Sequence, residues 1–374
     1  MIYDVIIIGA GPCGSILASR IAKDKKVLLI EKRSMTKDPS DWLRTEKCCG
    51  GMLDPSAQDA LSSLHIAIPK SVIEDPQIFV VRAIDFDNRK EQYYPRRYVN
   101  INRTAFDRFL LDRAKASDNV TLLDEHLLQS FTQSDGYVEA RILDKNTGEV
   151  KKFTGRYLVG ADGAASAVRA RLSEHFLLPV SGDRISGAAR NYTCVQEYFK
   201  VSPEEQIPYY GAVFDQKVTD FYSWLIPKRD QLIVGSAIPE GENVQQRFDR
   251  LKAELVQKGF PLGESLYRNG AKLLRPRPFG SVICGRERVF LCGEAAGLIS
   301  PSSAEGISYA IRSAVVLGKV LLNGRKGKME TYDEHLKPLK TEIALKSAKS
   351  PIMYGKTARG LVFATRVLSI KTEE

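Results

Sequence analysis

Residues 2–14, with the sequence IYDVIIIGAGPCG, decide the fold of this chain. The apolar, β-branched first half predicts a buried parallel strand, and residues 15–23 predict the helix that follows it. Gly9 permits a tight turn after the strand, Gly11 lets the backbone approach a pyrophosphate, and Gly14 allows the helix to pack closely on the strand. A diphosphate would therefore lie against the amide groups at the helix N-terminus.

A carboxylate closes the next predicted strand, at residues 27–30. Glu31 follows that strand about 20 residues after the glycine turn, where a carboxylate accepts hydrogen bonds from a ribose diol and disfavours a 2′-phosphate. Lys32 follows directly, and we include both residues among those expected to bind a dinucleotide. The alternative is a tight turn in an α/β fold that holds no dinucleotide.

Length and composition limit the class of protein. The 374 residues, of which 43% are hydrophobic and 27% charged, are typical of a globular protein with two or three structural units. This balance excludes a disordered chain, a collagen-like repeat and a polytopic membrane protein. The six scattered cysteines and four histidines show no metal-binding spacing. We expect no metal site and a reduced, cytoplasmic location without a signal peptide.

Stretches that alternate between helix and strand are interrupted twice by stretches rich in predicted strands. We therefore predict the α/β fold class, with a discontinuous Rossmann-like nucleotide-binding domain and an inserted β-sheet substrate domain. The nucleotide-binding domain is expected at residues 1–75, 103–178 and 281–330, the substrate domain at residues 76–102 and 179–280, and a C-terminal helical segment at residues 331–374.

Basic residues outnumber acidic ones by 55 to 45, which gives a formal net charge of +10. Residues 337–374 hold eight Lys or Arg and three Asp or Glu, interspersed with apolar residues. Such a segment is typical of contact with a membrane surface, and it lacks the aromatic and Arg clusters of a nucleic-acid-binding surface. We therefore expect no nucleic acid partner. The segment either touches the inner face of the membrane peripherally or forms a solvated closing helix.

Two later segments each end an apolar strand with glycine and a carboxylate. They are LVGADGAASAVR at residues 158–169 and FLCGEAAG at residues 290–297. Together with the glycine turn and with Arg103 in the segment NRTAFD, their order resembles the FAD-dependent oxidoreductases built like p-hydroxybenzoate hydroxylase. The resemblance implies an FAD-binding domain of that type and a non-covalently bound FAD.

The resemblance also assigns cofactor contacts to particular residues. In that superfamily the segment that matches Gly293 and Glu294 holds the ribityl chain, and the segment that matches Asp162 and Gly163 lies near the pyrophosphate. The usual residue at position 294 is Asp, so the carboxylate here is one methylene longer. The other residues expected to contact FAD are Cys49, Gly50, Gly51, Arg103, Gly306 and Ile307, the last two at the start of a helix predicted over residues 306–322.

Two further motifs narrow the resemblance. The sequence KCCGGML at residues 47–53 is similar to the Lys-x-Cys-Gly-Gly loop of the geranylgeranyl reductase family. The sequence YSWLIPK at residues 222–228 resembles that family's Tyr-x-Trp-x-Phe-Pro motif, with Ile226 in place of Phe. Members of the family reduce isolated C=C bonds in the prenyl chains of lipids or pigments. The resemblance covers essentially the whole chain.

These motifs suggest specific chemical roles. Tyr222 and Trp224 alternate by two, so on a strand they present aromatic surface to one side, as the wall of an apolar tunnel. Cys49 is expected beside the flavin as a proton donor, where Gly50 and Gly51 allow close approach of the backbone. The alternatives are ordinary sheet packing for the two aromatic residues and a buried, inert thiol for Cys49.

The resulting functional hypothesis is an FAD-dependent oxidoreductase that reduces C=C bonds of an apolar, isoprenoid-containing lipid. The sequence shows no second dinucleotide fingerprint, so electrons would come from transiently bound NAD(P)H or from a reduced redox protein. One alternative is a flavin-dependent monooxygenase or halogenase, because residues 222–227 are one aromatic residue away from a Trp-x-Trp-x-Ile-Pro halogenase signature. Another is a flavin-binding redox protein without turnover.

Overall fold

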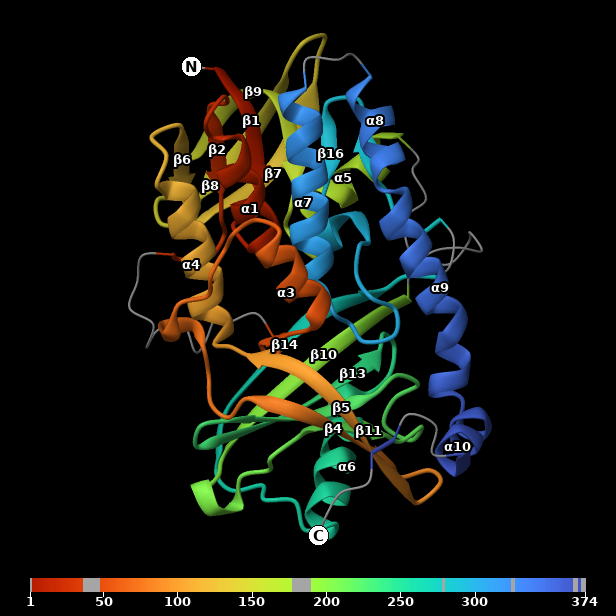
Figure 1. The fold of residues 1–374 in the computed structure, drawn as a ribbon. Coiled ribbons are helices and arrows are strands. Elements are labelled where there is room, and N and C mark those ends of the chain that lie inside the picture. Colours follow the sequence, from red (N-terminus) through yellow and green to blue (C-terminus); the bar gives the residue numbers. More distant parts are fainter. Residues whose placement is uncertain are drawn as a thin grey trace.

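The computed structural model describes residues 2–35, 48–176, 190–277, 280–323, 327–365 and 369–370. Two β-sheets stack one beyond the other, and helices cover one face of the first sheet (Figure 1). Three parts of the expectations lie outside the described residues. They are Lys47 of the first motif, the domain boundary expected at residues 178–179, and the chain end at residues 371–374.

The first sheet contains the predicted dinucleotide-binding strands. Its central strands follow the order β15-β16-β9-β1-β2-β6, and Ile7 of β1 pairs in parallel with Leu29 on one side and Val159 on the other. Strands β7 and β8 extend the sheet from β9 as an antiparallel pair. The strands are β1 (Ile2–Ile8), β2 (Val27–Ile30), β6 (Val120–Leu123), β7 (His126–Gln133), β8 (Val138–Asp144), β9 (Val150–Gly160), β15 (Gly285–Arg286) and β16 (Val289–Leu291).

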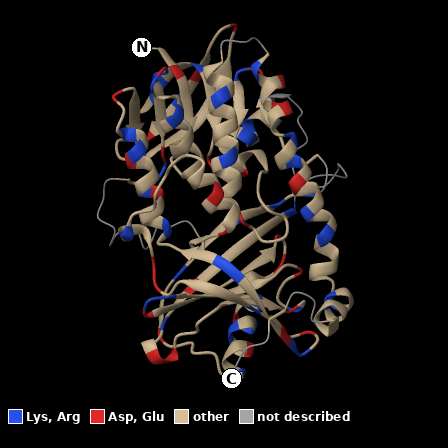
Figure 2. Cartoon of the chain, viewed as in Figure 1, with Lys and Arg blue, Asp and Glu red and all other residues tan. Residues whose placement is uncertain are grey.

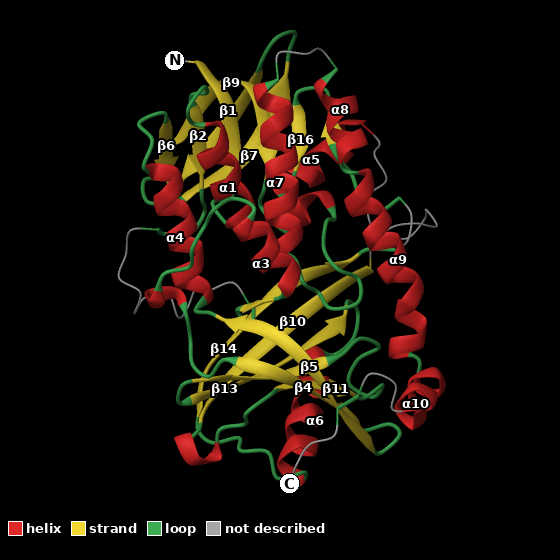
Figure 3. Ribbon diagram, viewed as in Figure 1, coloured by secondary structure: helices red, strands yellow, loops and turns green. Residues whose placement is uncertain are grey.

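Helices pack against this sheet because its strands are apolar on both faces, as expected for parallel strands. All four residues of β2 are buried, and α1 packs between α4 and α7 on the face seen in Figure 3. The helices are α1 (Pro12–Ile21), α3 (Pro55–Ser62), α4 (Arg103–Lys115), α5 (Ala167–Phe176), α6 (Val244–Gln257), α7 (Ile307–Leu322), α8 (Lys328–His335), α9 (Lys337–Tyr354) and α10 (Lys356–Thr365), with short 3-10 turns η1 (Lys70–Val72), η2 (Pro203–Glu205) and η3 (Gly293–Ala296).

The second sheet has the order β14-β10-β13-β12-β11-β4-β5-β3. One of its faces buries Leu225 with Phe248 of α6, and the opposite face carries Trp224 and Ile226 in a separate apolar cluster. Its strands are β3 (Met52–Leu53), β4 (Ile78–Asp85), β5 (Lys90–Asn100), β10 (Arg190–Lys200), β11 (Tyr210–Phe214), β12 (Ser223–Lys228), β13 (Gln231–Pro239) and β14 (Ser265–Arg275).

The fold class is confirmed: a Rossmann-like domain of the p-hydroxybenzoate hydroxylase type, an inserted β-sheet domain and a helical C-terminal segment. One detail differs from the expected boundaries. Met52 and Leu53, expected in the nucleotide-binding part, form β3 and pair with β5 at the edge of the second sheet. Among the described residues, no helix is both long enough and apolar enough to cross a bilayer.

Candidate functional site

In the glycine turn after β1, Gly9 and Gly14 have no room for a side chain, whereas Gly11 borders open space. A side-chain carbon on Gly9, which has φ +104°, would stand 2.5 Å from the carbonyl oxygen of Ala161. A side-chain carbon on Gly14 would stand 1.9 Å from the carbonyl oxygen of Gly9, so the helix packs on the turn as predicted. A side-chain carbon on Gly11 would meet no atom within 4 Å, and no side chain caps α1 at this residue. The space beside Gly11 is therefore open, and no side chain caps the start of α1.

The ends of three adjacent parallel strands meet beside this turn, as expected at the carboxyl edge of such a sheet. Asp162 follows β9, and its Oδ2 accepts a hydrogen bond from the Ala167 amide at 2.7 Å. Its Oδ1 is buried without a hydrogen-bond partner, and burial raises the pKa of the carboxyl group. Gly293 follows β16 with φ +61°, and a side-chain carbon there would stand 3.2 Å from Sγ of Cys13 on α1.

Two more glycines take part in these strand ends. Gly163 has φ +77°, a backbone conformation that glycine adopts without strain. Gly297 ends η3 with φ +83°, and a side-chain carbon there would stand 2.4 Å from the carbonyl oxygen of Ser281. The loops after β9 and β16 therefore depend on glycine to turn beside the open face of α1.

Glu31 is buried at the end of β2, next to the glycine turn. Its Oε2 accepts a hydrogen bond from the Ala10 amide at 2.9 Å, and its Oε1 accepts bonds from the amide and Nε of Arg33, both at 3.0 Å. Burial acts to raise the pKa of Glu31, but the Arg33 charge and these hydrogen bonds outweigh it and lower the pKa. Glu31 is therefore a fixed carboxylate at the place where the sequence predicts contact with a ribose.

Arg33 was not anticipated from the sequence, and it extends the charged contacts toward α4. Its Nη1 lies 3.5 Å from Oδ2 of Asp107, and Nε of Arg103 donates to Oδ1 of the same carboxylate at 2.8 Å. Lys32 is exposed, and its carbonyl oxygen accepts a bond from Lys145 Nζ at 3.0 Å; its expected contact with the cofactor stays a prediction. A signal for this network was present in the i, i+4 spacing of Arg103 and Asp107.

The residues present fit an FAD molecule. The uncapped amide groups of α1, in front of the open space at Gly11, suit an anionic diphosphate. Glu31 supplies an acceptor for ribose hydroxyls, and the unpartnered Oδ1 of Asp162 supplies another acceptor for a hydroxyl-bearing chain. These features lie along one edge of the first sheet, at the turn that the sequence singled out.

The Cys-Gly-Gly loop lies directly against the strand that carries the second motif. A side-chain carbon on Gly50 would stand 2.1 Å from Cδ1 of Ile226 on β12. Gly51 has φ +62°, and its carbonyl oxygen accepts a bond from Nζ of Lys228 at 3.2 Å. The same Nζ donates to the carbonyl oxygen of Ile101 at 2.7 Å. The two motifs therefore form one contact, in which Lys228 is a residue that the sequence did not reveal.

Cys49 lies between the cofactor-binding elements and the aromatic wall. Burial acts to lower the pKa of Arg103, but the neighbouring Asp107 and Cys49 outweigh it and raise that pKa. Burial raises the pKa of Tyr222, and Cys49 contributes to this rise. The structure therefore brings together Cys49, Arg103 and Tyr222, three residues that were selected separately.

Tyr222, directly before β12, and Trp224 on β12 lie on the same side of the chain, as their spacing predicts. Their ring centroids are 5.9 Å apart, and Trp224 Nε1 donates to Oε1 of Gln196 at 3.1 Å. The Tyr222 hydroxyl donates to the carbonyl oxygen of Ser303 at 2.7 Å, in the loop before α7. Tyr354, from the end of α9, stacks on Tyr222 with ring centroids 6.4 Å apart and an interplanar angle of 20°. The aromatic wall thus includes a residue from the C-terminal segment.

The start of α7 is occupied by a carboxylate that the sequence did not identify. Glu305 Oε1 accepts a bond from the Ser308 amide at 2.6 Å, and its Oε2 accepts a bond from the Ser308 hydroxyl at 2.7 Å. Burial and the nearby Asp54 raise the pKa of Glu305 to about 7. Gly306 caps the helix and Ile307 is its first, buried residue. Both expected FAD contacts therefore lie beside a carboxyl group that titrates near neutral pH.

Glu294 joins the two sheets. Its side chain lies in η3 after β16, and its Oε1 accepts a bond from the Leu274 amide of β14 at 3.4 Å. The longer side chain at this position thus reaches the second sheet. Its expected contact with the ribityl chain stays a prediction.

The fold and this arrangement define an FAD-dependent oxidoreductase, and the FAD binding domain family matches residues 2–179. The chain belongs to the family of the CbrA proteins. It is 33% identical to Protein CbrA of Escherichia coli over 98% of this chain and 94% of that protein. It is 36% identical to Protein CbrA of Shigella dysenteriae over 86% of this chain and 84% of that protein.

Solved structures with the same fold belong to proteins whose names describe different reactions. A geranylgeranyl bacteriochlorophyll reductase-like protein from Thermoplasma acidophilum has a TM-score of 0.79 and 19% identity, over 99% of this chain and 92% of that one. The p-nitrophenol 4-monooxygenase of Pseudomonas putida has a TM-score of 0.71 and 15% identity, over 98% and 94%. Aklavinone-11 hydroxylase, in complex with FAD and aklavinone, has a TM-score of 0.68 and 19% identity, over 99% and 71%. These likenesses show the fold.

Proposed function

We propose that this FAD-dependent oxidoreductase reduces C=C bonds in an apolar, isoprenoid-containing lipid. The observation that carries the proposal is the contact between the two motifs, where Gly50 packs on Ile226 and Lys228 holds the carbonyl oxygen of Gly51. Both motifs resemble those of the geranylgeranyl reductases, and here they form a single wall beside the cofactor-binding edge. The likeness to the Thermoplasma protein agrees with this proposal.

The residues of this wall suit the chemistry of alkene reduction. Bound and reduced FAD supplies a hydride, and the reaction needs a proton on the other carbon. We assign Cys49 as the donor of that proton, because a thiol next to the expected flavin position can act as a general acid. Arg103 next to the thiol stabilises the thiolate that remains after the proton has left. Tyr222 and Trp224 exclude water from the same space.

A monooxygenase is the second candidate function, because two of the similar structures are a p-nitrophenol monooxygenase and an aklavinone hydroxylase. The fold accommodates both reactions, so it does not discriminate between them. The Cys-Gly-Gly loop packed on β12 favours reduction. Transiently bound NAD(P)H or a reduced redox protein would provide the electrons, and rates of flavin bleaching with each donor identify which one the protein uses.

Mass spectrometry of the product tests the proposal. Purified holoenzyme, reduced with dithionite under nitrogen, is incubated with a geranylgeranyl lipid in detergent. A gain of two hydrogen atoms for each reduced bond supports the proposed function. Incorporation of one labelled oxygen atom, when the reduced enzyme meets labelled dioxygen and substrate, assigns a monooxygenase instead. An unchanged lipid under both conditions contradicts turnover of this substrate class and favours a flavin-binding redox protein.

A further inference from the structure

Helix α10 partly reverses the usual orientation of polar and apolar side chains. A helix on a globular protein normally turns its apolar face to the core. Here Arg359 is only 3% exposed and is buried together with Phe363, whereas Leu361 is 67% exposed and Val362 is also exposed. Two apolar side chains, Leu361 and Val362, therefore face outward on a helix that Arg359 and Phe363 attach to the protein.

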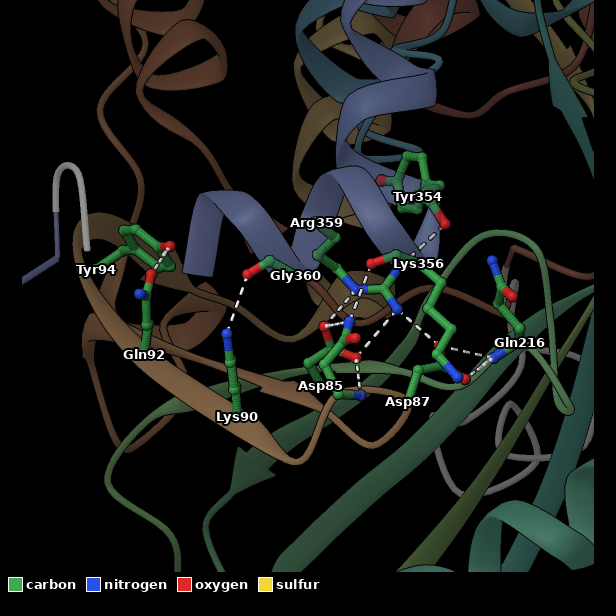
Figure 4. Close-up of polar contacts among 11 residues, drawn as sticks. Asp85, Asp87, Lys90, Gln92, Tyr94, Gln216, Tyr354, Lys356, Arg359 and Gly360 are labelled. Carbon is green, nitrogen blue, oxygen red and sulfur yellow. Dashed lines mark hydrogen bonds and ion pairs between the residues drawn. The ribbon is translucent and has the colours of Figure 1, made fainter. Parts of the chain in front are cut away.

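Polar contacts to the β4–β5 hairpin hold this reversed orientation (Figure 4). Arg359 Nε lies 2.8 Å from Oδ2 of Asp85, and its Nη2 lies 2.6 Å from Oδ2 of Asp87. Lys90 Nζ donates to the carbonyl oxygen of Gly360 at 3.2 Å. A buried ion pair fixes geometry through its directional hydrogen bonds. These contacts fix the rotation of α10 about its axis. Leu361 and Val362 therefore point outward in a defined orientation.

The second half of α9 has the same reversed polarity. Its buried face carries Ser347 and Ser350, while Ile352 is 54% exposed and Leu345 and Met353 are also exposed. The two helices follow one another along the side of the molecule (Figure 1). We call their exposed apolar side chains the outer apolar row, which consists of Leu345, Ile352, Met353, Leu361 and Val362.

We propose that the outer apolar row binds the surface of an anionic lipid bilayer. Lys349 and Lys356 are exposed within the row, and neither forms an ion pair in the part of the chain that the structure describes. Residues 345–365 contain no Asp or Glu, and basic residues follow α9 along its length in Figure 2. Apolar side chains flanked by lysines match a bilayer, because its interior takes up the former and its anionic headgroups attract the latter.

The charge pattern also argues against a second copy of this chain as the partner. In a two-fold symmetric contact the same surface patch faces itself. Such a contact would bring the lysines of residues 345–365 from two copies together, without any carboxylate from that segment to pair with them. An anionic bilayer gives each lysine a partner of opposite charge.

The row borders the aromatic wall of the candidate site. Tyr354 follows Met353 directly, but its side chain points inward and stacks on Tyr222. A lipid bound at the outer apolar row would therefore lie next to a residue that packs on the aromatic wall. This link between docking and substrate delivery rests on the proposed function, whereas docking itself does not.

Vesicle flotation with the purified, FAD-loaded full chain tests the proposal. The probes are vesicles of phosphatidylcholine alone and of phosphatidylcholine mixed with phosphatidylglycerol, without any prenyl lipid, so the outcome is independent of the proposed function. We expect the protein to float with the mixed vesicles at low salt and to be released by high salt. Equal recovery with the two kinds of vesicle would overturn the proposal.

Matched variants assign the binding to the row. We expect Leu361→Glu and Ile352→Glu each to weaken partition into the mixed vesicles about tenfold. Val256→Glu, at an exposed apolar position on α6, is the control and leaves partition unchanged. Equal losses for all three variants, or no loss for the first two, would contradict the assignment. If light scattering shows a dimer that Leu361→Glu dissociates, the partner is a second copy of the chain, and the proposal of bilayer binding is wrong.

Lysine variants test the electrostatic part separately. Lys349→Gln with Lys356→Gln should weaken binding to the mixed vesicles and make the remainder less sensitive to salt. Lys115→Gln, at an exposed position at the end of α4, is the control. If the control weakens binding as much as the pair does, the overall positive charge is responsible and the proposed surface is wrong.

Discussion

Cδ1 of Ile226 lies 2.1 Å from the point where a side-chain carbon on Gly50 would stand. The two residues belong to motifs far apart in the sequence, and this contact brings the Cys-Gly-Gly loop onto β12. Because Gly50 has no side chain, there is room for Cδ1 of Ile226. The contact thus explains why the loop has glycine at this position.

Gly50→Ala should lower the free energy of unfolding by about 1–3 kcal/mol, because the new methyl group overlaps Ile226. Ile226→Val removes Cδ1 and costs about 0.5–1.5 kcal/mol alone, but it should recover part of the loss when combined with Gly50→Ala. Urea unfolding of the four proteins gives the coupling energy. Ile233→Val, in the neighbouring strand β13, is the control and should not rescue. Additive costs for the first pair would contradict the contact.

The sequence allowed the first sheet and its turn to be predicted because their signals are local. The apolar run before Gly9 and the three spaced glycines predict strand, turn and helix from adjacent residues. The alternation of Tyr222 and Trp224 likewise placed both rings on the same side of the chain. The neighbours of these residues could not be predicted in the same way, because they come from distant parts of the chain.

Two residues illustrate this limit. No sequence motif pointed to Arg33, but alternation after the strand places Arg33 against the Glu31 carboxylate, while Lys32 is exposed and its expected contact with the cofactor stays a prediction. Tyr354 lies in the basic tail without any motif, and only the packing of α9 brings it onto Tyr222. Local rules predicted the elements, whereas the composition of the site depends on how the elements pack.

Glu31→Ala should weaken FAD binding. The purified protein is expected to be yellow and to release FAD, not FMN, on denaturation. Loss of the carboxylate removes an acceptor for the ribose and leaves the Ala10 amide and Arg33 without their partner. We expect a loss of about 1–3 kcal/mol, or roughly ten- to hundredfold in the dissociation constant, measured by fluorescence of released FAD. Lys32→Ala should cost less, and an equal cost would contradict the central role of Glu31.

Glu305 should make the stability of the protein depend on pH. Its pKa of about 7 in the folded protein lies above the ordinary value of 4.5, so between these values the folded state binds more protons than the unfolded state. Stability from this group therefore falls as pH rises from 4.5 to 7. Glu305→Gln removes the titration and should stabilise the protein above pH 7 on the order of 1–3 kcal/mol, with little gain near pH 4.5.

Thermal unfolding across this pH range measures the effect. Glu149→Gln, the same change at an exposed carboxyl group far from α7, is the control. A Glu305→Gln difference that does not vary with pH would show that the carboxyl group acts only through its hydrogen bonds to Ser308.

Arg359→Ala should strongly destabilise the attachment of α10. The substitution leaves Asp85 buried without its ion-pair partner, a change that typically costs about 3–5 kcal/mol. Adding Asp85→Asn removes the unpaired charge and should recover part of the loss. Urea unfolding and protease sensitivity of the C-terminal segment measure both effects. Equal destabilisation of the single and double variants would show that the ion pair does not determine the attachment.

Cys49→Ala should separate chemistry from cofactor binding. The variant is expected to retain FAD and to be reduced by dithionite, because Cys49 is not part of the glycine turn and does not bond directly to Glu31. It should lose about 10²–10⁴ in the rate at which a prenyl lipid reoxidises the reduced protein, the usual cost of removing a positioned general acid. Stopped-flow absorbance of the flavin measures this rate.

Cys48→Ala is the matched control, since Cys48 is the adjacent thiol with similar partial burial. It should change the rate much less, because the Arg103 hydrogen bond belongs to Cys49. A monooxygenase would show little sensitivity to Cys49→Ala and would place oxygen in the product. If the Cys49 and Cys48 variants are equally active and the product gains oxygen, the protein is not a reductase of the proposed kind, while its fold and its FAD remain as described.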